Sequence, residues 1–223
     1  MSGLERAGWI AGAAVSAALL YASWLRLISS APIEVLGFVA GGACVWLAVR
    51  ENIWNWPIGI ANSVFYVVVF LQARLFADMS LQLAFAVLGF YGWYMWLFGG
   101  EARTQEQVSR TPWPQWIALC AACAAATWGA SVYLATIRDA APFLDALITS
   151  MSLVAQYMLT RKYLENWFVW IAVDVISVGL FAFKHLGHTA VLYAIYLAMC
   201  VAGVSQWRRS MTAHEAELQP AHA

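Results

Sequence analysis

The sequence predicts an all-α membrane protein whose eight transmembrane helices form two parallel three-helix repeats, a linker helix and one extra N-terminal helix. Two observations predict this fold class: apolar stretches of membrane-spanning length recur along the chain, and the second half repeats the first. Hydrophobic residues occupy 63% of the 223 positions and charged residues only 11%. A water-soluble domain carries charges at roughly a quarter of its positions, so a lipid bilayer is the expected solvent.

Eight apolar stretches approach the roughly 20 residues that a helix needs to cross the hydrocarbon of a bilayer. They cover residues 9–27, 33–49, 53–72, 79–98, 116–136, 143–160, 167–183 and 189–207. The connections between them are short and leave no room for a water-soluble domain. The four cysteines lie inside these stretches, and we interpret them as small packing residues rather than as a disulfide, redox or metal pair.

Lysine and arginine are unevenly distributed between the two sides of the predicted spans. One side carries Arg6, Arg50, Arg103, Arg110, Arg161, Lys162, Arg208 and Arg209, and the other carries Arg26, Arg74, Arg138 and Lys184. Because cytoplasmic loops hold the excess of these residues, the distribution predicts that both termini face the cytoplasm. The basic residues are scattered rather than gathered in a patch, so no nucleic-acid partner is expected.

An internal repeat emerges when the sequence is shifted against itself by 111 residues. Without a gap, the shift aligns Arg50 with Arg161, Asn55 with Asn166, Trp56 with Trp167, Gly92 with Gly203 and Trp96 with Trp207. The two copies begin an even number of spans apart, so equivalent helices must cross the membrane in the same direction. Two parallel three-helix units joined by a linker helix are the architecture of SWEET-like transporters, whose solute site lies between the repeats near mid-membrane.

The repeat divides the chain into five predicted segments. Residues 1–31 hold the extra N-terminal helix, residues 32–98 the first three-helix repeat, and residues 99–137 a cytoplasmic loop with the linker helix. Residues 138–207 form the second three-helix repeat, and residues 208–223 form a polar cytoplasmic tail. The alternative interpretation is a structural membrane subunit, in which duplication merely enlarged the bundle.

Polar side chains in the middle of the spans are candidates for a solute site, since each is costly in hydrocarbon unless it is paired or faces water. Asp174 follows Asn166 by eight positions, which places it about 12 Å deeper along a helix. Trp170 precedes Asp174 by one helical turn and shares its helix face. An aromatic surface beside a carboxylate suits a flat cationic ring. A protonated Asp174 that hydrogen-bonds a neighbouring helix is the alternative.

Further polar residues on the same spans complete the candidate binding site. These are Asn62, Tyr66, Gln82, Tyr193 and Tyr196, whose amide and hydroxyl groups can hydrogen-bond a ribose or a carboxamide, or simply bridge neighbouring helices. Trp56 and Trp93, near the cytoplasmic helix ends, are candidate gate residues, with anchoring at the membrane interface as the alternative. No nucleotide-phosphate loop and no metal-ligand spacing is found, so we expect no enzyme activity, no metal and no cofactor.

Several motifs resemble the PnuC family of vitamin transporters. In the first repeat these are residues 52–59 (Asn-Ile-Trp-Asn-Trp-Pro-Ile-Gly), 76–79 (Phe-Ala-Asp-Met) and 91–96 (Tyr-Gly-Trp-Tyr-Met-Trp). Residues 155–157, 160–162, 165–167 and 190–194 resemble that family's later helices, and the similarity extends over residues 34–209. The resemblance implies import of nicotinamide riboside across the bacterial inner membrane by facilitated diffusion, with trapping by a cytoplasmic kinase that phosphorylates it.

The resemblance also implies the three-plus-one-plus-three fold, a homo-oligomer with a trimer as one option, and substrate contacts by Trp170, Asn62 and Gln82. Asp174 departs from the family, in which we expect asparagine at this place in many members. The departure leaves thiamine, riboflavin or a nucleoside as alternative substrates, and proton coupling as an alternative to uniport.

Overall fold

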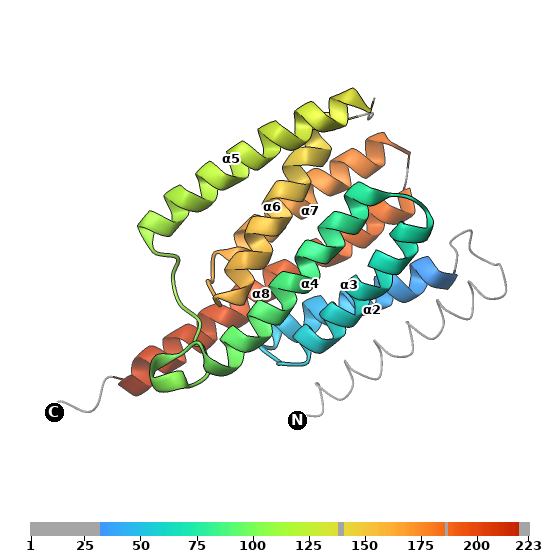
Figure 1. Ribbon diagram of the computed structural model, residues 1–223. Coiled ribbons are helices and arrows are strands. Elements are labelled where there is room, and N and C mark those ends of the chain that lie inside the picture. The colour runs from blue at the N-terminus through green and yellow to red at the C-terminus, as the bar shows by residue number, and fades with distance from the viewer. Residues whose placement is uncertain (1–31, 138–140, 186, 219–223) are drawn as a thin grey trace. The chain divides into compact units, whose positions relative to one another are not determined.

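The computed structural model describes residues 32–137, 141–185 and 187–218, and the regular elements of these residues are helices (Figure 1). They are α2 (Pro32–Val49), α3 (Asn55–Gln72), α4 (Phe76–Phe98), the short 3-10 helix η1 (Glu101–Arg103), α5 (Trp113–Thr136), α6 (Pro142–Thr160), α7 (Asn166–Phe183) and α8 (Gly187–Leu218). The chain divides into two compact units, residues 1–43 and residues 44–223, so α2 begins in the first unit and ends in the second. The predicted first span, residues 9–27, lies outside the described residues.

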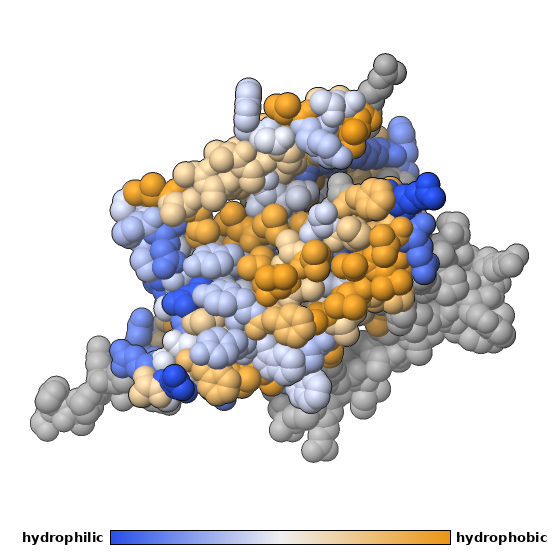
Figure 2. All heavy atoms as spheres, viewed as in Figure 1, coloured by the Kyte–Doolittle hydropathy of each residue, from blue (hydrophilic) through white to orange (hydrophobic). Residues whose placement is uncertain are grey.

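Several of these helices have the length and composition of membrane spans. Five apolar segments qualify within the described residues: Asp78–Phe98, Trp113–Thr136, Pro142–Thr160, Asn166–Phe183 and Thr189–Ala216. The described apolar part of α2 is shorter, Val39–Val49, and α3 has polar residues at both ends. Figure 2 shows apolar side chains across the middle of the visible face and hydrophilic ones toward its ends. For the described residues, the prediction of helices with several apolar segments long enough to cross a membrane is thereby confirmed, and the number eight stays a prediction.

The internal repeat is visible in the helix boundaries. A shift of 111 residues places both ends of α3 (Asn55–Gln72) on both ends of α7 (Asn166–Phe183). The same shift places the start of α4 on the start of α8 and the end of α2 on the end of α6. Duplication of the sequence has therefore produced equivalent helix boundaries: α3 and α7 have the same length, and the turns before and after them have the same length.

The turns between the repeated helices also share their backbone conformation. Glu51 and Lys162, which are equivalent under the shift, have φ angles of 51° and 47°. Arg74 and His185, equivalent in the next turn, have φ angles of 57° and 58°. These left-handed conformations are unfavourable for residues with a Cβ, at a cost on the order of 1 kcal/mol each, so the surrounding packing must maintain them.

Two contacts between a glycine and a tryptophan hold equivalent helix pairs together. A Cβ atom at Gly92 of α4 would overlap the indole of Trp56 on α3, and a Cβ atom at Gly203 of α8 would overlap the indole of Trp167 on α7. Both indoles are buried, with 2% of each residue exposed. Because only glycine lets a helix backbone approach the ring this closely, α3 packs on α4 in the way that α7 packs on α8.

Tryptophan side chains also join the two repeats at one end of the bundle. The indole N–H of Trp96 on α4 donates to the carbonyl of Leu159 on α6, and the indole N–H of Trp207 on α8 donates to the carbonyl of Ala48 on α2, each at 3.0 Å. The two donors are equivalent under the shift, and so are the two acceptors. Each repeat therefore binds the other through the same hydrogen bond.

These rings form a compact group, which we call the tryptophan cluster: Trp56, Trp96, Trp167 and Trp207. Trp56 and Trp96 meet edge to face with ring centroids 5.3 Å apart, and Trp167 and Trp207 do so at 5.4 Å. The centroids of Trp96 and Trp207 lie 6.1 Å apart. Aliphatic residues from the ends of α2 and α6 complete this buried core. We refer to this end of the bundle as the tryptophan end.

The outermost elements extend the predicted segments slightly. α5 lies beside α6 on the outside of the other helices and packs mainly against it (Figure 1); it corresponds to the predicted linker helix over residues 116–136. α8 continues to Leu218, beyond the predicted span that ended at residue 207. Its last turns contain Arg208, Arg209 and Glu215, which favour helix, so the first part of the predicted polar tail is helical.

Gly92→Ala is expected to destabilise the protein, because the added methyl group overpacks the contact with Trp56. Overpacking of a filled core costs about 1–3 kcal/mol, which should lower the melting temperature in detergent, followed by intrinsic fluorescence. Gly179→Ala on α7 is the matched control, since its added Cβ meets nothing within 4 Å. Equal melting temperatures for the two variants would contradict the close approach of α3 and α4.

Candidate functional site

A buried carboxylate lies in the middle of α7. Asp174 is 3% exposed, and the thiol of Cys200 on α8 donates a hydrogen bond to its Oδ2 at 3.4 Å. Among the ion pairs of the described residues, none involves Asp174. A carboxylate that is buried with only a weak thiol donor is unstable as an anion, unless a proton or a positive charge compensates it. The site therefore favours a proton or a cationic ligand.

Two tyrosines of α8 lie near this carboxylate, and Tyr66 of α3 lies near one of them. Tyr196 on α8 lies within electrostatic range of Asp174, of Tyr193 and of Tyr66 on α3. The rings of Tyr193 and Tyr196 meet edge to face at 6.1 Å, and Tyr193 stacks on Phe181 of α7 at 5.2 Å. The structure thus brings together four residues predicted from the sequence, Tyr66, Asp174, Tyr193 and Tyr196.

Two cysteines complete what we call the central cluster: Cys44, Tyr66, Asp174, Tyr193, Tyr196 and Cys200. Cys44 on α2 is also within electrostatic range of Tyr196, and its Sγ faces Gly59 of α3. The cluster draws on α2 and α3 from the first repeat and on α7 and α8 from the second. Sequence reasoning assigned both cysteines to packing alone, because nothing in a single helix sequence shows which residue of another helix it faces.

Ser177 adds an unpaired polar group near this cluster. It lies one helical turn beyond Asp174 on α7 and is 0% exposed. Its hydroxyl has no hydrogen-bond partner among the described residues. A buried hydroxyl without a partner costs free energy, so the interior of the bundle retains an unused donor and acceptor beside the carboxylate.

The remaining predicted binding residues are Trp170, Asn62 and Gln82, and all three are half-buried. Trp170 on α7 is half-buried and packs against the core around the tryptophan cluster, one turn before Asp174. Along α7 it therefore lies between the tryptophan cluster and the carboxylate. Asn62 on α3 and Gln82 on α4 are both half-buried, and their contact with a ligand stays a prediction.

Both predicted gate residues belong to the tryptophan end. Trp56 is part of the tryptophan cluster, and Trp93 is half-buried and packs against the same core. Val108 and Leu164 enter that core from the two chain segments that cross this end. The tryptophan end is thus a packed, mostly apolar layer, and Cys200 of the central cluster belongs to the same buried core.

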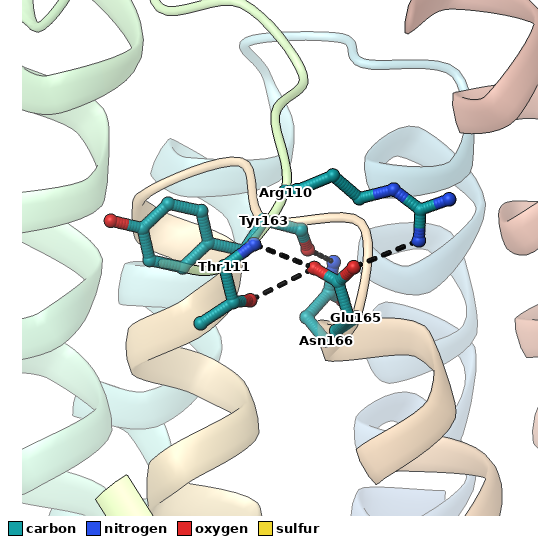
Figure 3. A network of polar contacts seen from close by, with 5 residues as sticks. All are labelled: Arg110, Thr111, Tyr163, Glu165 and Asn166. Atoms are coloured by element: carbon teal, nitrogen blue, oxygen red, sulfur yellow. Dashed lines mark hydrogen bonds and ion pairs between the residues drawn. The ribbon is translucent and has the colours of Figure 1, made fainter. Parts of the chain in front are cut away.

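The loop between η1 and α5 binds the turn between α6 and α7. We call residues 104–112 the strap. Its Ser109 accepts a backbone hydrogen bond from Leu164 at 2.9 Å and donates one to Lys162 at 3.1 Å, in the manner of a parallel β-bridge. Glu165 then receives three hydrogen bonds of 2.9 Å, one from the Arg110 guanidinium and two from the backbone N–H and the hydroxyl of Thr111 (Figure 3).

These contacts determine the protonation of the two carboxylates at the strap. Burial alone would raise the pKa of Glu165, but the hydrogen bonds from Arg110 and Thr111 outweigh it and hold the pKa below its usual value. At Glu106, by contrast, burial raises the pKa, against the opposing charges of Arg161 and Lys162. Glu165 is therefore the anion on which attachment of the strap depends.

An ion pair joins the turns of the two repeats at the tryptophan end. The Lys162 ammonium lies 2.9 Å from Oε2 of Glu51 and 4.7 Å from the centre of the Trp96 ring. The side chain of Lys162 is only 8% exposed and that of Glu51 only 17%. Glu51 and Lys162 are equivalent residues of the two repeats, 111 positions apart, so the pair lies at the centre of the pseudosymmetric contact. Opposite charges at equivalent positions were a sequence signal that could have identified it.

A separate apolar groove of about 500 Å³ runs between α5 and the helices α6 and α7. It is lined by Trp116, Cys120, Thr127, Phe143, Met151 and Val169, among others. The groove offers almost no polar group for a ribose or a charged ring, and it opens to the outside of the bundle, where lipid is expected. The central cluster is therefore the candidate for a solute site, and its contact with a solute stays a prediction. In the described residues, no group of His, Cys, Asp and Glu could hold a metal ion.

Comparison with known proteins decides which membrane-protein class this geometry represents. The family described as nicotinamide mononucleotide transporter matches residues 31–209, which include both repeats. The chain belongs to the PnuC family of membrane transporters. Membership in a transporter family argues against the alternative of a purely structural subunit.

Individual relatives cover most of the chain. The nicotinamide riboside transporter PnuC of Escherichia coli is 30% identical over 204 residues, which are 80% of this chain and 85% of that protein. The riboflavin/roseoflavin transporter RibM of Streptomyces davaonensis is 26% identical over 178 residues, covering 78% and 83%. A crystal structure of the vitamin B3 transporter PnuC shares the fold, with a TM-score of 0.72 at 23% identity over 96% of this chain and 94% of that one.

The attachment of the strap should depend on pH through Glu165. Because the folded-state pKa of Glu165 is lowered, its contribution is present above the unfolded value of about 4.3 and is lost as the pH falls through the folded pKa. Glu165→Gln should therefore lower the melting temperature at pH 7, and the difference from wild type should shrink below about pH 4.3.

Glu101→Gln on η1, an exposed residue outside the strap, is the matched control and should melt like wild type throughout. A difference between Glu165→Gln and wild type that persists unchanged at low pH would contradict the ionic attachment.

Proposed function

We propose that this PnuC-family transporter imports nicotinamide riboside by facilitated diffusion. The observation that carries the proposal is the buried Asp174, which has no cationic partner in the described part of the chain. Nicotinamide riboside contains a permanently cationic pyridinium ring, which would supply the missing positive charge. The relative from Escherichia coli carries the name of a transporter of this solute.

In the proposed complex, the pyridinium stacks on Trp170 and pairs with Asp174, because both lie on one face of α7. The ribose hydroxyls and the carboxamide meet Asn62 and Gln82 and the hydroxyl groups of Tyr66, Tyr193 and Tyr196. The solute then lies between the two repeats of a three-plus-one-plus-three bundle, at mid-membrane. Trp56 and Trp93 act as gate residues between this site and the tryptophan end.

The direction of net transport is proposed to come from metabolism. No phosphate-binding loop is present in the sequence, so import runs down the concentration gradient and a cytoplasmic kinase traps the solute by phosphorylation. The basic residues near the tryptophan end support a cytoplasmic location for that end. Both termini then face the cytoplasm of a bacterial inner membrane, and the working form is a homo-oligomer such as a trimer.

The charge of Asp174 also fits thiamine, another cationic vitamin, which is the alternative substrate. Riboflavin is neutral and gains nothing from a buried carboxylate, although the Streptomyces davaonensis relative bears its name. Proton-coupled import is the alternative mechanism, because a buried carboxyl can also carry a proton.

Empty proteoliposomes should take up nicotinamide riboside until the inner and outer concentrations are equal, with no gradient imposed.

Asp174→Asn preserves the shape of the side chain and removes its charge. The variant should bind nicotinamide riboside at least about tenfold more weakly, since a hydrogen bond or ion pair to a buried charge contributes about 1.5–3 kcal/mol. Asp78→Asn, at the exposed start of α4, is the matched control and should leave uptake unchanged.

Accumulation above the external concentration, driven by a proton gradient and lost in Asp174→Asn, would replace uniport by proton symport. Equal uptake by Asp174→Asn and wild type would contradict the proposed role of the carboxylate. Parallel uptake of thiamine and riboflavin separates the vitamins: preferential uptake of riboflavin would overturn the charge argument altogether.

A further inference from the structure

We propose that the gate at the tryptophan end is asymmetric: the turn of residues 50–54 moves, while the strap holds the equivalent turn of residues 161–165 in place. The inference deepens the proposed transport function, on which it rests. Its basis is a difference between two halves that are otherwise alike.

The two turns match in their backbone. Each turn has one residue in the left-handed conformation, Glu51 or Lys162. The N–H of Glu51 donates to the carbonyl of Ala48 at 3.0 Å, and the N–H of Lys162 donates to that of Leu159 at 3.1 Å. The helices that follow begin at equivalent residues, Asn55 and Asn166. A difference in mobility between the turns must therefore come from what contacts them, not from how they are built.

Only the second turn carries the strap. Lys162, Leu164 and Glu165 are all bonded to residues of the strap. The residue equivalent to Glu165 in the first turn is Trp54, which is 62% exposed. Backbone hydrogen bonds of the first turn, as far as the described residues show, run to residues 46–48 and within the turn itself.

The neighbouring asparagines differ in the same sense. The side-chain amide of Asn166 donates to the carbonyl of Tyr163 at 2.6 Å and so ties α7 to its turn. The equivalent amide of Asn55 is buried, but it has no hydrogen-bond partner among the described residues. The start of α3 thus lacks a bond that the start of α7 makes.

The strap also joins α4 of the first repeat to the second turn. The N–H of Glu106 donates to the carbonyl of Trp96, while the indole of Trp96 donates to Leu159 of α6. Arg161 extends from the second turn to the sulfur of Met95 at 3.7 Å. α4, the strap and the second turn therefore form one connected body.

Ile53 of the first turn packs against the core of the tryptophan end, and two polar contacts among the described residues also join the first turn and the end of α2 to their surroundings. Glu51 pairs with Lys162, and Ala48, in the last turn of α2, accepts the indole hydrogen bond of Trp207. Beyond the turn, Pro57 and Gly59 occupy the positions of Phe168 and Trp170 in the second repeat. Loss of the ion pair between Glu51 and Lys162 would remove a direct link between the two turns.

Spin labels test which side moves. Labels at Trp54→Cys and Gln107→Cys report the distance from the first turn to the strap, and labels at Gln107→Cys and Arg209→Cys report the distance from the strap to α8, all at exposed positions. The background replaces the four native cysteines, and double electron–electron resonance measures the distances. Each pair is compared with and without Glu51→Gln, and with and without nicotinamide riboside.

Glu51→Gln should add a longer component to the 54–107 distance and leave the 107–209 distance unchanged. A shift in the 107–209 distance of similar size, or a 54–107 distance that responds to neither change, would overturn the asymmetric gate. A response to Glu51→Gln without any response to nicotinamide riboside would support the gate and count against the proposed substrate.

Chemical cross-links provide a functional test. It reads uptake directly and needs no distance measurement. A short bifunctional thiol reagent joins Glu51→Cys to Lys162→Cys in one variant and Ser109→Cys to Tyr163→Cys in the other. The first link should stop uptake of nicotinamide riboside, reversibly on reduction, and the second should leave uptake unchanged. Loss of uptake from the second link, or normal uptake with the first, would overturn the proposal.

Discussion

The structure depends on two indole hydrogen bonds exchanged between the repeats. Trp96 donates to Leu159 and Trp207 donates to Ala48, and each acceptor lies in the last turn of its helix. Each carbonyl already accepts the N–H of the following turn, so the indole uses its second lone pair. Because a buried indole N–H without a partner is costly, this exchange fixes both the depth and the rotation of α4 and α8 relative to α2 and α6.

The rest of the site follows from this fixed end. Trp56 and Trp167 fill the space against Gly92 and Gly203, and α3 and α7 leave the cluster side by side with their partner helices. Asp174 lies two turns deeper on α7, where α8 presents Cys200. The apolar layer and the carboxylate are thus parts of one helix register, which links packing at the tryptophan end to the geometry of the proposed solute site.

Much of this arrangement was accessible from the sequence. The 111-residue shift identified equivalent residues, and the helix boundaries of α3 and α7 agree with it. The periodicity of one helix placed Trp170 and Asp174 on a common face. The contact between Asp174 and Cys200 was not predictable, because it depends on the rotation of α8 against α7, which apolar helices of uniform composition leave open. The strap was missed because a short polar loop gives no sign of which turn it binds.

The proposed path of the solute runs between the repeats and past the Asp174–Cys200 contact. The most direct test is the reactivity of Cys200 as the only cysteine, with Cys44, Cys120 and Cys123 replaced by alanine, toward a membrane-impermeant thiol reagent in proteoliposomes. Cys200 should react slowly, as a 3% exposed residue that water reaches only when the bundle opens, and saturating nicotinamide riboside should protect it. A labelling rate that nicotinamide riboside leaves unchanged would contradict a solute path at this contact.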